Sequence, residues 1–182
     1  MKRVLFLFGE LNDLDVDWLI SNGRKESVGQ GTVLIQEGKP IYALFVVLDG
    51  VFLVSVAGLS NQEIARMGIG DILGEMSFVD SRPPSTTVQA LVNSVVFAIS
   101  RERLSAKLAQ DLGFAARFYR ALSIILSHRF RRMTLRFGER QHGSPSSETQ
   151  SADELDSQVL ENVYIAGMVL YFKDGLYTGQ GV

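Results

Sequence analysis

Residues 74–88 read GEMSFVDSRPPSTTV, and this stretch decides the fold. It opens with a glycine and a glutamate before small and apolar residues, which predicts a short helical turn, and it ends in hydroxyl residues that lead into a β-branched strand. Backbone N–H groups at the start of a helix favour an anion, most often phosphate. Glu75 offers acceptor oxygens to a ribose hydroxyl, and Ser85, Thr86 and Thr87 offer hydroxyl groups to phosphate oxygens. The stretch therefore predicts a phosphate site, without naming the ligand.

These residues resemble the phosphate-binding cassette of the cyclic nucleotide-binding domain family, and other segments in the same order resemble other parts of it. These segments are 11–19 (the family's first helix), 31–40 (an early strand and glycine turn), 43–54 (the central hairpin) and 68–75 (the approach to the cassette). The resemblance covers about residues 5 to 137. It implies an α+β fold, namely a double-stranded β-helix or jelly roll (β-roll) with an N-terminal helix and a long C-terminal helix.

The pattern of apolar and turn residues independently predicts a small antiparallel barrel or jelly roll between Ser27 and Ile99, where turns recur every 8 to 12 residues or so. Before it, residues 11–22 read as a helix, capped by Asn12 or Asp13 and ended by Asn22 and Gly23. The predicted strands are Val33–Ile35, Ala43–Leu48, Val51–Val56, Glu63–Met67, Thr86–Leu91 and Ser94–Ala98.

Two helices are expected after the last strand. Ser100 would cap a short helix over Arg101–Leu112, and Gly113 would separate it from a long helix over residues 114–137. We therefore expect residues 1–137 to form one domain. Residues 138–158 are expected to be a flexible polar linker, and residues 159–182 a short hydrophobic tail that forms a strand or a helix and docks on the domain or on a partner.

One departure from the family concerns the cassette. Members that bind cyclic AMP (cAMP) or cyclic GMP (cGMP) usually have an arginine just before the pair of hydroxyl residues, where this chain has Pro84. Proline offers no hydrogen-bond donor, and the nearest arginine is Arg82, two residues earlier. The resemblance implies that ribose and phosphate are held by Gly74, Glu75, Met76 and Ser77, with further phosphate contacts from Arg82, Ser85 and Thr86.

Arginines gather on the long helix, where Glu139 is the only acid. Arg129 and Arg132 continue, at spacings of three and four, the line of apolar residues that precedes them, so they share its face. In the family this helix lies across the base of the ligand and commonly pairs with its twin in a homodimer, here through residues 114–137. We expect Arg129 and Arg132 to cover the bases of a cyclic dinucleotide such as cyclic di-GMP (c-di-GMP), because guanidinium groups bind phosphate and stack on bases. A solvated charged face is the alternative.

Composition limits the other function classes. The chain has 182 residues, 46% of them hydrophobic, a net charge of −2 and no cysteine, so it cannot form disulfides or thiolate metal sites. Neither a signal peptide nor a membrane-spanning stretch is expected, which favours a cytoplasmic protein without a membrane partner. Asp13, Asp15 and Asp17 alternate as in a calcium loop, but its glycine and final glutamate are missing. His128 and His142 are isolated, so metal binding is not expected.

The sequence thus predicts a non-enzymatic receptor without a cofactor, which binds a cyclic nucleotide second messenger and acts through a protein partner such as a transcription factor. No acid/base pair, nucleophile triad or metal set is visible. Direct DNA binding is not expected, because a single lysine, Lys173, and no arginine follow Arg140. The alternative is a ligand-free member of the family that serves as a scaffold for dimerisation or protein interaction.

Overall fold

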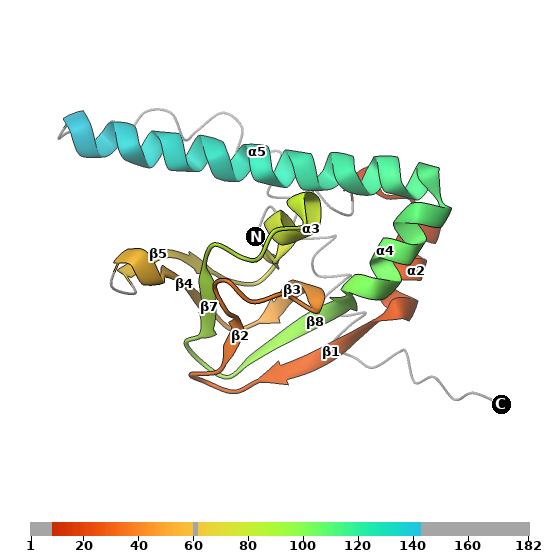
Figure 1. The fold of residues 1–182 in the computed structure, drawn as a ribbon, viewed down its shortest axis with the longest axis horizontal. Helices are drawn as coiled ribbons and strands as arrows, with labels where there is room; N and C mark the ends of the chain where they lie inside the picture. The colour runs from red at the N-terminus through yellow and green to blue at the C-terminus, as the bar shows by residue number, and fades with distance from the viewer. Residues whose placement is uncertain (1–8, 60–61, 143–182) are drawn as a thin grey trace, which may run out of the picture. The chain divides into compact units, whose positions relative to one another are not determined.

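Two antiparallel four-stranded sheets face each other in the part of the chain that the computed structural model describes, residues 9–59 and 62–142 (Figure 1). The strands are β1 (Gly23–Val28), β2 (Val33–Ile35), β3 (Ala43–Asp49), β4 (Phe52–Val56), β5 (Gln62–Met67), β6 (Ile72–Leu73), β7 (Thr87–Ala90) and β8 (Ser94–Ser100). Their order is β1-β8-β3-β6 in one sheet and β2-β7-β4-β5 in the other. The chain passes repeatedly between the sheets, which confirms the predicted jelly roll.

One helix described here precedes the strands in the sequence, one lies between β6 and β7, and two follow β8. They are α2 (Asp13–Asn22), α3 (Glu75–Asp80), α4 (Arg101–Gln110) and α5 (Leu112–His142), with a 3₁₀ turn, η1 (Ala57–Leu59). The sheets, α2, α3, α4 and α5 as far as His128 belong to one compact unit, and a second unit begins at Arg129. No helix of the described ranges is long and apolar enough to cross a membrane.

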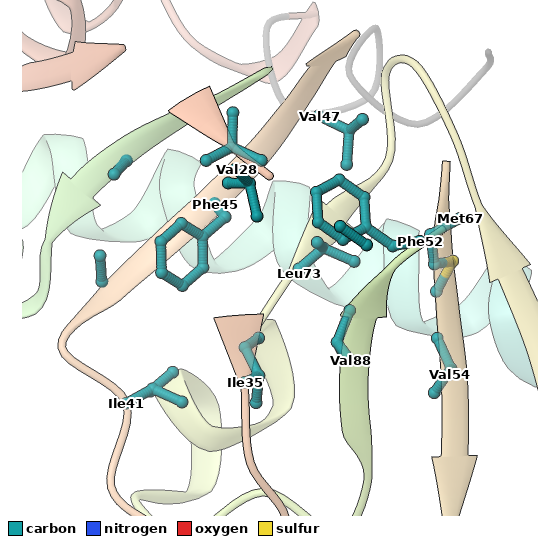
Figure 2. Packing of buried hydrophobic residues seen from close by; sticks show 14 residues of the cluster. Val28, Ile35, Ile41, Phe45, Val47, Phe52, Val54, Met67, Leu73 and Val88 are labelled. Carbon is teal, nitrogen blue, oxygen red and sulfur yellow. The ribbon is translucent and has the colours of Figure 1, made fainter. Parts of the chain in front are cut away.

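The core lies between the two sheets. Phe45 of β3 and Phe52 of β4 have no exposed surface, and Figure 2 shows them among Leu73 of β6 and Val88 of β7. Side chains of a strand alternate between its faces, so Phe45 points into this core while its neighbours Leu44 and Val46 point away from it. Leu44 and Val46 are also buried, because α2 and α4 pack on this sheet. Burial on both faces explains the continuous apolar sequence of β3.

A row of aromatic rings joins three helices. Trp18 of α2 meets Phe114 edge-on at 5.6 Å between ring centroids, Phe114 stacks on Phe118 at 5.7 Å, and Phe118 meets Phe78 of α3 at 6.1 Å. Phe114 and Phe118 are completely buried. The start of α5 is therefore fixed against both α2 and the short helix α3.

A buried ion pair strengthens the contact between α2 and α5. Asp15 is 3% exposed and accepts hydrogen bonds from Nε and Nη2 of Arg117 at 2.6 and 2.9 Å. The hydrogen bond from Arg117 is the main reason that the pKa of Asp15 is lowered. Asp15 also completes a capping box with Asn12, as expected for acidic residues at a helix start.

The six predicted strands are present close to their predicted bounds, but β1 and β6 were not predicted. The sequence of β1, GRKESV, buries only Val28, so it lacks the alternation that marks a half-buried strand. Pairing with β8 over its whole length forms it instead. β6 has two residues, too few to show a pattern.

The bounds of the long helix also differ from the prediction. Helix α5 begins at Leu112 and continues to His142, so Gly113 lies inside its first turn and the break falls at Asp111. Asp111 explains this, because its Oδ1 accepts a hydrogen bond from the Phe114 amide at 2.9 Å, in the manner of an N-cap. Residues 143–182, with most of the expected linker and all of the tail, lie outside the described residues.

Candidate functional site

The turn into α3 requires glycine. Gly74 has φ of +88° and ψ of 2°, the left-handed conformation that side chains rarely adopt. A Cβ atom at this position would lie 2.9 Å from Cδ1 of Ile41 and 3.4 Å from the carbonyl oxygen of Ala43. The backbone of the turn therefore packs directly on the segment that leads into β3, and this close approach aims the first amides of α3.

The side chains in the first turn of α3 differ strongly in their exposure to solvent. Glu75 is 2% exposed and Ser77 is 4% exposed, whereas Met76 between them is 56% exposed. A buried carboxylate is held in one position and is costly to keep charged without compensating contacts. Glu75 and Ser77 thus lie inside the protein, whereas the side chain of Met76 faces the solvent.

Arg101 anchors α3 from the other side. Its Nη1 donates a hydrogen bond to the carbonyl oxygen of Ser77 at 2.9 Å, and its guanidinium carbon lies 5.2 Å from the centre of the Phe78 ring. Sequence reasoning missed this residue, because Arg101 lies far from Ser77 in the sequence and nothing in its neighbourhood indicates the contact.

The segment after α3 is held by backbone contacts. Asp80 Oδ1 accepts a hydrogen bond from the Arg82 amide at 3.0 Å, and the carbonyl oxygen of Pro84 accepts one from the Gly38 amide at 2.8 Å. The side chain of Arg82 is exposed, as is that of Ser85. These bonds hold the backbone of the segment, and they leave the guanidinium of Arg82 at the surface.

The hydroxyl residues that follow differ in their surroundings. Thr86 is half-buried. Oγ1 of Thr87 accepts a hydrogen bond from the Glu37 amide at 3.2 Å, so one hydroxyl expected to face phosphate is engaged by the chain itself. That bond joins the end of the cassette to the turn between β2 and β3.

The arginines of α5 fall into two groups. Arg117 is paired with Asp15, and Nε of Arg120 lies 2.6 Å from a carboxylate oxygen of Glu10. Two arginines of this helix are therefore paired with acids from a distant part of the sequence, namely Asp15 of α2 and Glu10, which precedes α2. Arg129 and Arg132 belong to the second unit, so their place over a ligand stays a prediction.

Comparison with known proteins identifies the domain that these residues form. The sequence model of the family described as "Cyclic nucleotide-binding domain" matches residues 25–111, which begin inside β1 and include β2 to β8, α3 and α4. Residues 25–111 belong to the cyclic nucleotide-binding domain family. Among described residues, no group of three or more histidines, aspartates and glutamates is arranged to hold a metal ion in or around this domain.

Solved structures agree with this assignment. The catabolite activator protein of Thermus thermophilus is 26% identical with a TM-score of 0.60, over 75% of this chain and 63% of that one. The regulatory domain of PKA from Toxoplasma gondii, crystallised with cAMP, is 25% identical with a TM-score of 0.53, over 58% of this chain and 42% of that one. A cyclic nucleotide-binding domain from Methylobacillus flagellatus has a TM-score of 0.66 at 23% identity, over 81% of this chain and 87% of that one, and shows the shared fold alone. The chain thus spans less than two thirds of the first two proteins.

Proposed function

We propose that the protein is a receptor for a cyclic nucleotide second messenger and that it passes the signal to a protein partner without catalysing a reaction. The observation that carries this proposal is the turn into α3, where left-handed Gly74 leads into the buried residues Glu75 and Ser77 inside a cyclic nucleotide-binding domain. In this proposal Glu75 accepts a hydrogen bond from a ribose hydroxyl, and the amides of α3 bind phosphate.

A cyclic dinucleotide such as c-di-GMP is our preferred ligand over cAMP or cGMP. Pro84 stands where a guanidinium would neutralise a cyclic phosphate, and Arg82, two residues earlier, has an exposed side chain. Arg82, Ser85 and Thr86 then add contacts at the edge of the phosphate site. The second phosphate and the two bases would be met by Arg129 and Arg132, because guanidinium both pairs with phosphate and stacks on bases.

We also propose a homodimer through α5. Leu112, Tyr119 and Phe130 are 81%, 42% and 68% exposed, and their spacing of seven and eleven residues places them on one stripe of the helix. The stripe differs from the buried line of Phe114, Phe118, Leu122 and Ile125. Apolar residues at this spacing are those that pair two helices, and Met133 and Phe137 continue it in the sequence. The dimer would present the signal to a protein partner such as a transcription factor.

Calorimetric titration of the full chain with cAMP, cGMP, c-di-GMP and cyclic di-AMP tests the ligand. We expect saturable binding of a dinucleotide, lost in the double variant Arg129→Ala/Arg132→Ala and kept in Arg131→Ala. Arg131 is an exposed arginine two positions from Arg129, so replacing it removes one positive charge from another face of α5. Binding of cAMP or cGMP alone would contradict the choice of ligand, and an unchanged affinity of the double variant would contradict the role of the two arginines.

A ligand-free scaffold is the second candidate, and Pro84 is the residue that favours it. The melting temperature measured with and without nucleotide distinguishes the receptor from the scaffold, because a ligand that binds only the folded protein raises the melting temperature by mass action. If none of the four nucleotides raises the melting temperature at concentrations up to the millimolar range, the scaffold replaces the receptor.

A further inference from the structure

The short helix α3 ends in a strained turn. Its last residue, Asp80, is followed by Ser81, which has φ of 58° and ψ of 17°. Among the residues that the structure describes, Ser81 alone has a positive φ without being a glycine. In the left-handed conformation the Cβ atom lies too close to the following carbonyl oxygen, which favours other conformations by about fivefold to thirtyfold. The end of the helix therefore acts against the order of α3.

The length of α3 adds to this weakness. The helix has six residues, whereas isolated helices shorter than about 12–15 residues are marginal in water. The last four carbonyl groups of an α-helix have no partner within the helix, and in α3 the first of these belongs to Ser77. Contacts from outside the helix must therefore hold α3 in place.

Arg101 supplies contacts of this kind. Its Nη1 donates a hydrogen bond to the Ser77 carbonyl oxygen at 2.9 Å, and its guanidinium carbon lies 5.2 Å from the centre of the Phe78 ring. Phe78 is 6% exposed and is the residue by which α3 meets Phe118 of α5. One side chain thus contacts both the backbone of α3 and the ring that joins α3 to α5.

The backbone of Arg101 is itself held at the sheet. Its amide donates a hydrogen bond to the carbonyl oxygen of Tyr42 at 2.9 Å. The hydroxyl of Tyr42 donates one to Oε2 of Glu26 in β1 at 2.8 Å, so the residue that accepts from Arg101 is anchored as well. The guanidinium therefore extends towards α3 from a fixed backbone.

The place of Arg101 in its own helix does not explain an arginine. Arg101 is the first residue of α4, and the N-terminal end of a helix dipole is positive, which disfavours a cation there. Glu102, the next residue, carries the charge that this end of a helix favours. The side chain of Arg101 thus stabilises α3 rather than α4.

We propose that Arg101 is a positioning residue of the cassette, which holds α3 in the conformation that binds the ligand against the strain at Ser81. Without this contact α3 loses its order while the two sheets stay folded, because the hydrophobic cluster between them contains no residue of α3. The fraction of molecules with an ordered α3 then limits the apparent affinity for the ligand. The part on affinity rests on the proposed function, whereas the part on the order of α3 does not.

Amide hydrogen exchange of the ¹⁵N-labelled full chain without ligand, followed by NMR, tests the order of α3. Arg101→Gln should speed the exchange of the Val79 and Asp80 amides about tenfold or more, because a charged hydrogen bond is lost. The amides of the paired strands β3 and β8 should keep their rates. Arg103→Gln is the matched control, since Arg103 is an exposed arginine two positions further along α4, and it should change neither set of rates.

Ser81→Gly tests the strain without altering Arg101, and it does so even if Arg101→Gln does not fold. It should slow the exchange of the Val79 and Asp80 amides about fivefold, because the strain that it relieves exceeds the cost of the greater chain entropy of glycine. In the double variant Arg101→Gln/Ser81→Gly it should restore part of the lost protection. Unchanged or faster exchange in Ser81→Gly would overturn the role of the strain.

Two results would overturn the role of Arg101. One is equal exchange of the α3 amides in Arg101→Gln and Arg103→Gln. The other is an equal acceleration of the α3 amides and of the β3 and β8 amides in Arg101→Gln, because that result indicates a loss of stability of the whole domain rather than of α3.

Calorimetric titration of the same variants with cAMP, cGMP, c-di-GMP and cyclic di-AMP tests the effect on affinity. The affinity for the nucleotide that the wild type binds should fall in Arg101→Gln, stay unchanged in Arg103→Gln and recover in Arg101→Gln/Ser81→Gly. Full affinity of Arg101→Gln despite faster exchange of α3 would overturn the link between order and affinity. If the wild type binds none of the four, the receptor proposal fails, and the exchange rates still decide the role of Arg101.

Discussion

Replacing Gly74 with alanine should lower the free energy of unfolding more than replacing Gly31, although the two glycines have nearly the same φ angle. Their φ angles are +88° and +82°. For alanine, the left-handed conformation alone costs about 1–2 kcal/mol. No atom lies within 4 Å of a Cβ placed on Gly31, so Gly31→Ala measures this backbone cost alone.

Gly74→Ala adds a contact to the same backbone cost. Its Cβ would lie 2.9 Å from Cδ1 of Ile41 and 3.4 Å from the carbonyl oxygen of Ala43, and overpacking of this kind typically costs about 1–3 kcal/mol. We therefore expect a loss of roughly 2–5 kcal/mol in total. Cδ1 is the flexible end of the Ile41 side chain and can move, whereas the carbonyl oxygen of Ala43 belongs to the backbone and cannot. The loss therefore falls in the lower half of that range only if the Ile41 side chain turns away.

Urea denaturation of four variants separates the backbone cost from the cost of the contact with Ile41. They are Gly31→Ala, Gly74→Ala, Ile41→Val and the double variant Gly74→Ala/Ile41→Val. Ile41→Val removes Cδ1 and should cost about 0.5–1.5 kcal/mol alone, but less or nothing beside Gly74→Ala, because it then relieves the contact. Equal losses for Gly31→Ala and Gly74→Ala, or strictly additive losses in the double variant, would refute the reasoning.

Three further predictions concern the supports of the fold. Asp15→Asn should cost roughly 2–4 kcal/mol because it leaves Arg117 without its buried partner. The pKa of Asp15 is lowered in the folded state, so its contribution to the free energy of unfolding is complete above the unfolded pKa near 4 and is lost as the pH falls through the folded pKa. The difference in the free energy of unfolding between wild type and variant, measured with urea, should therefore shrink as the pH is lowered over this range. Phe118→Ala, which opens a cavity between α3 and α5, should cost about 3–5 kcal/mol in the same assay, and a cost below 1 kcal/mol would contradict the packing described. Glu26→Gln should lower the pKa of Tyr42 from about 12, but not fully to its usual value, since burial is the larger cause; absorbance titration against Tyr42→Phe measures it, and an unchanged value would contradict the hydrogen bond.

Local signals in the sequence were sufficient wherever a short segment determines its own conformation. The capping residues of α2 and α4, the strands Val33–Ile35 and β3, and the turn at Gly74 all have their cause within a few residues. The resemblance to a family added the order of these segments, and with it the two-sheet arrangement.

Features that depend on distant partners could not be predicted in this way. Arg101 supports α3 across the fold, and Arg117 and Arg120 find their acids around α2. Asp111 rather than Gly113 ends α4, because its side chain caps the next helix, and a glycine is tolerated in the first turn of a long helix. In each case the deciding contact joins residues whose proximity only the folded chain reveals.

The polar sequence of β1 has a consequence for association between molecules. In the described part of the fold β1 is an outer strand of its sheet, and the strand that pairs with it is β8. Charged side chains on such a strand, here Arg24, Lys25 and Glu26, discourage edge-to-edge pairing with a strand of another molecule. The polar composition of β1 thus gives no strand pattern in the sequence and also disfavours aggregation through this edge. Valines at positions 24 and 25 would make the strand easier to predict and the protein more prone to form fibres.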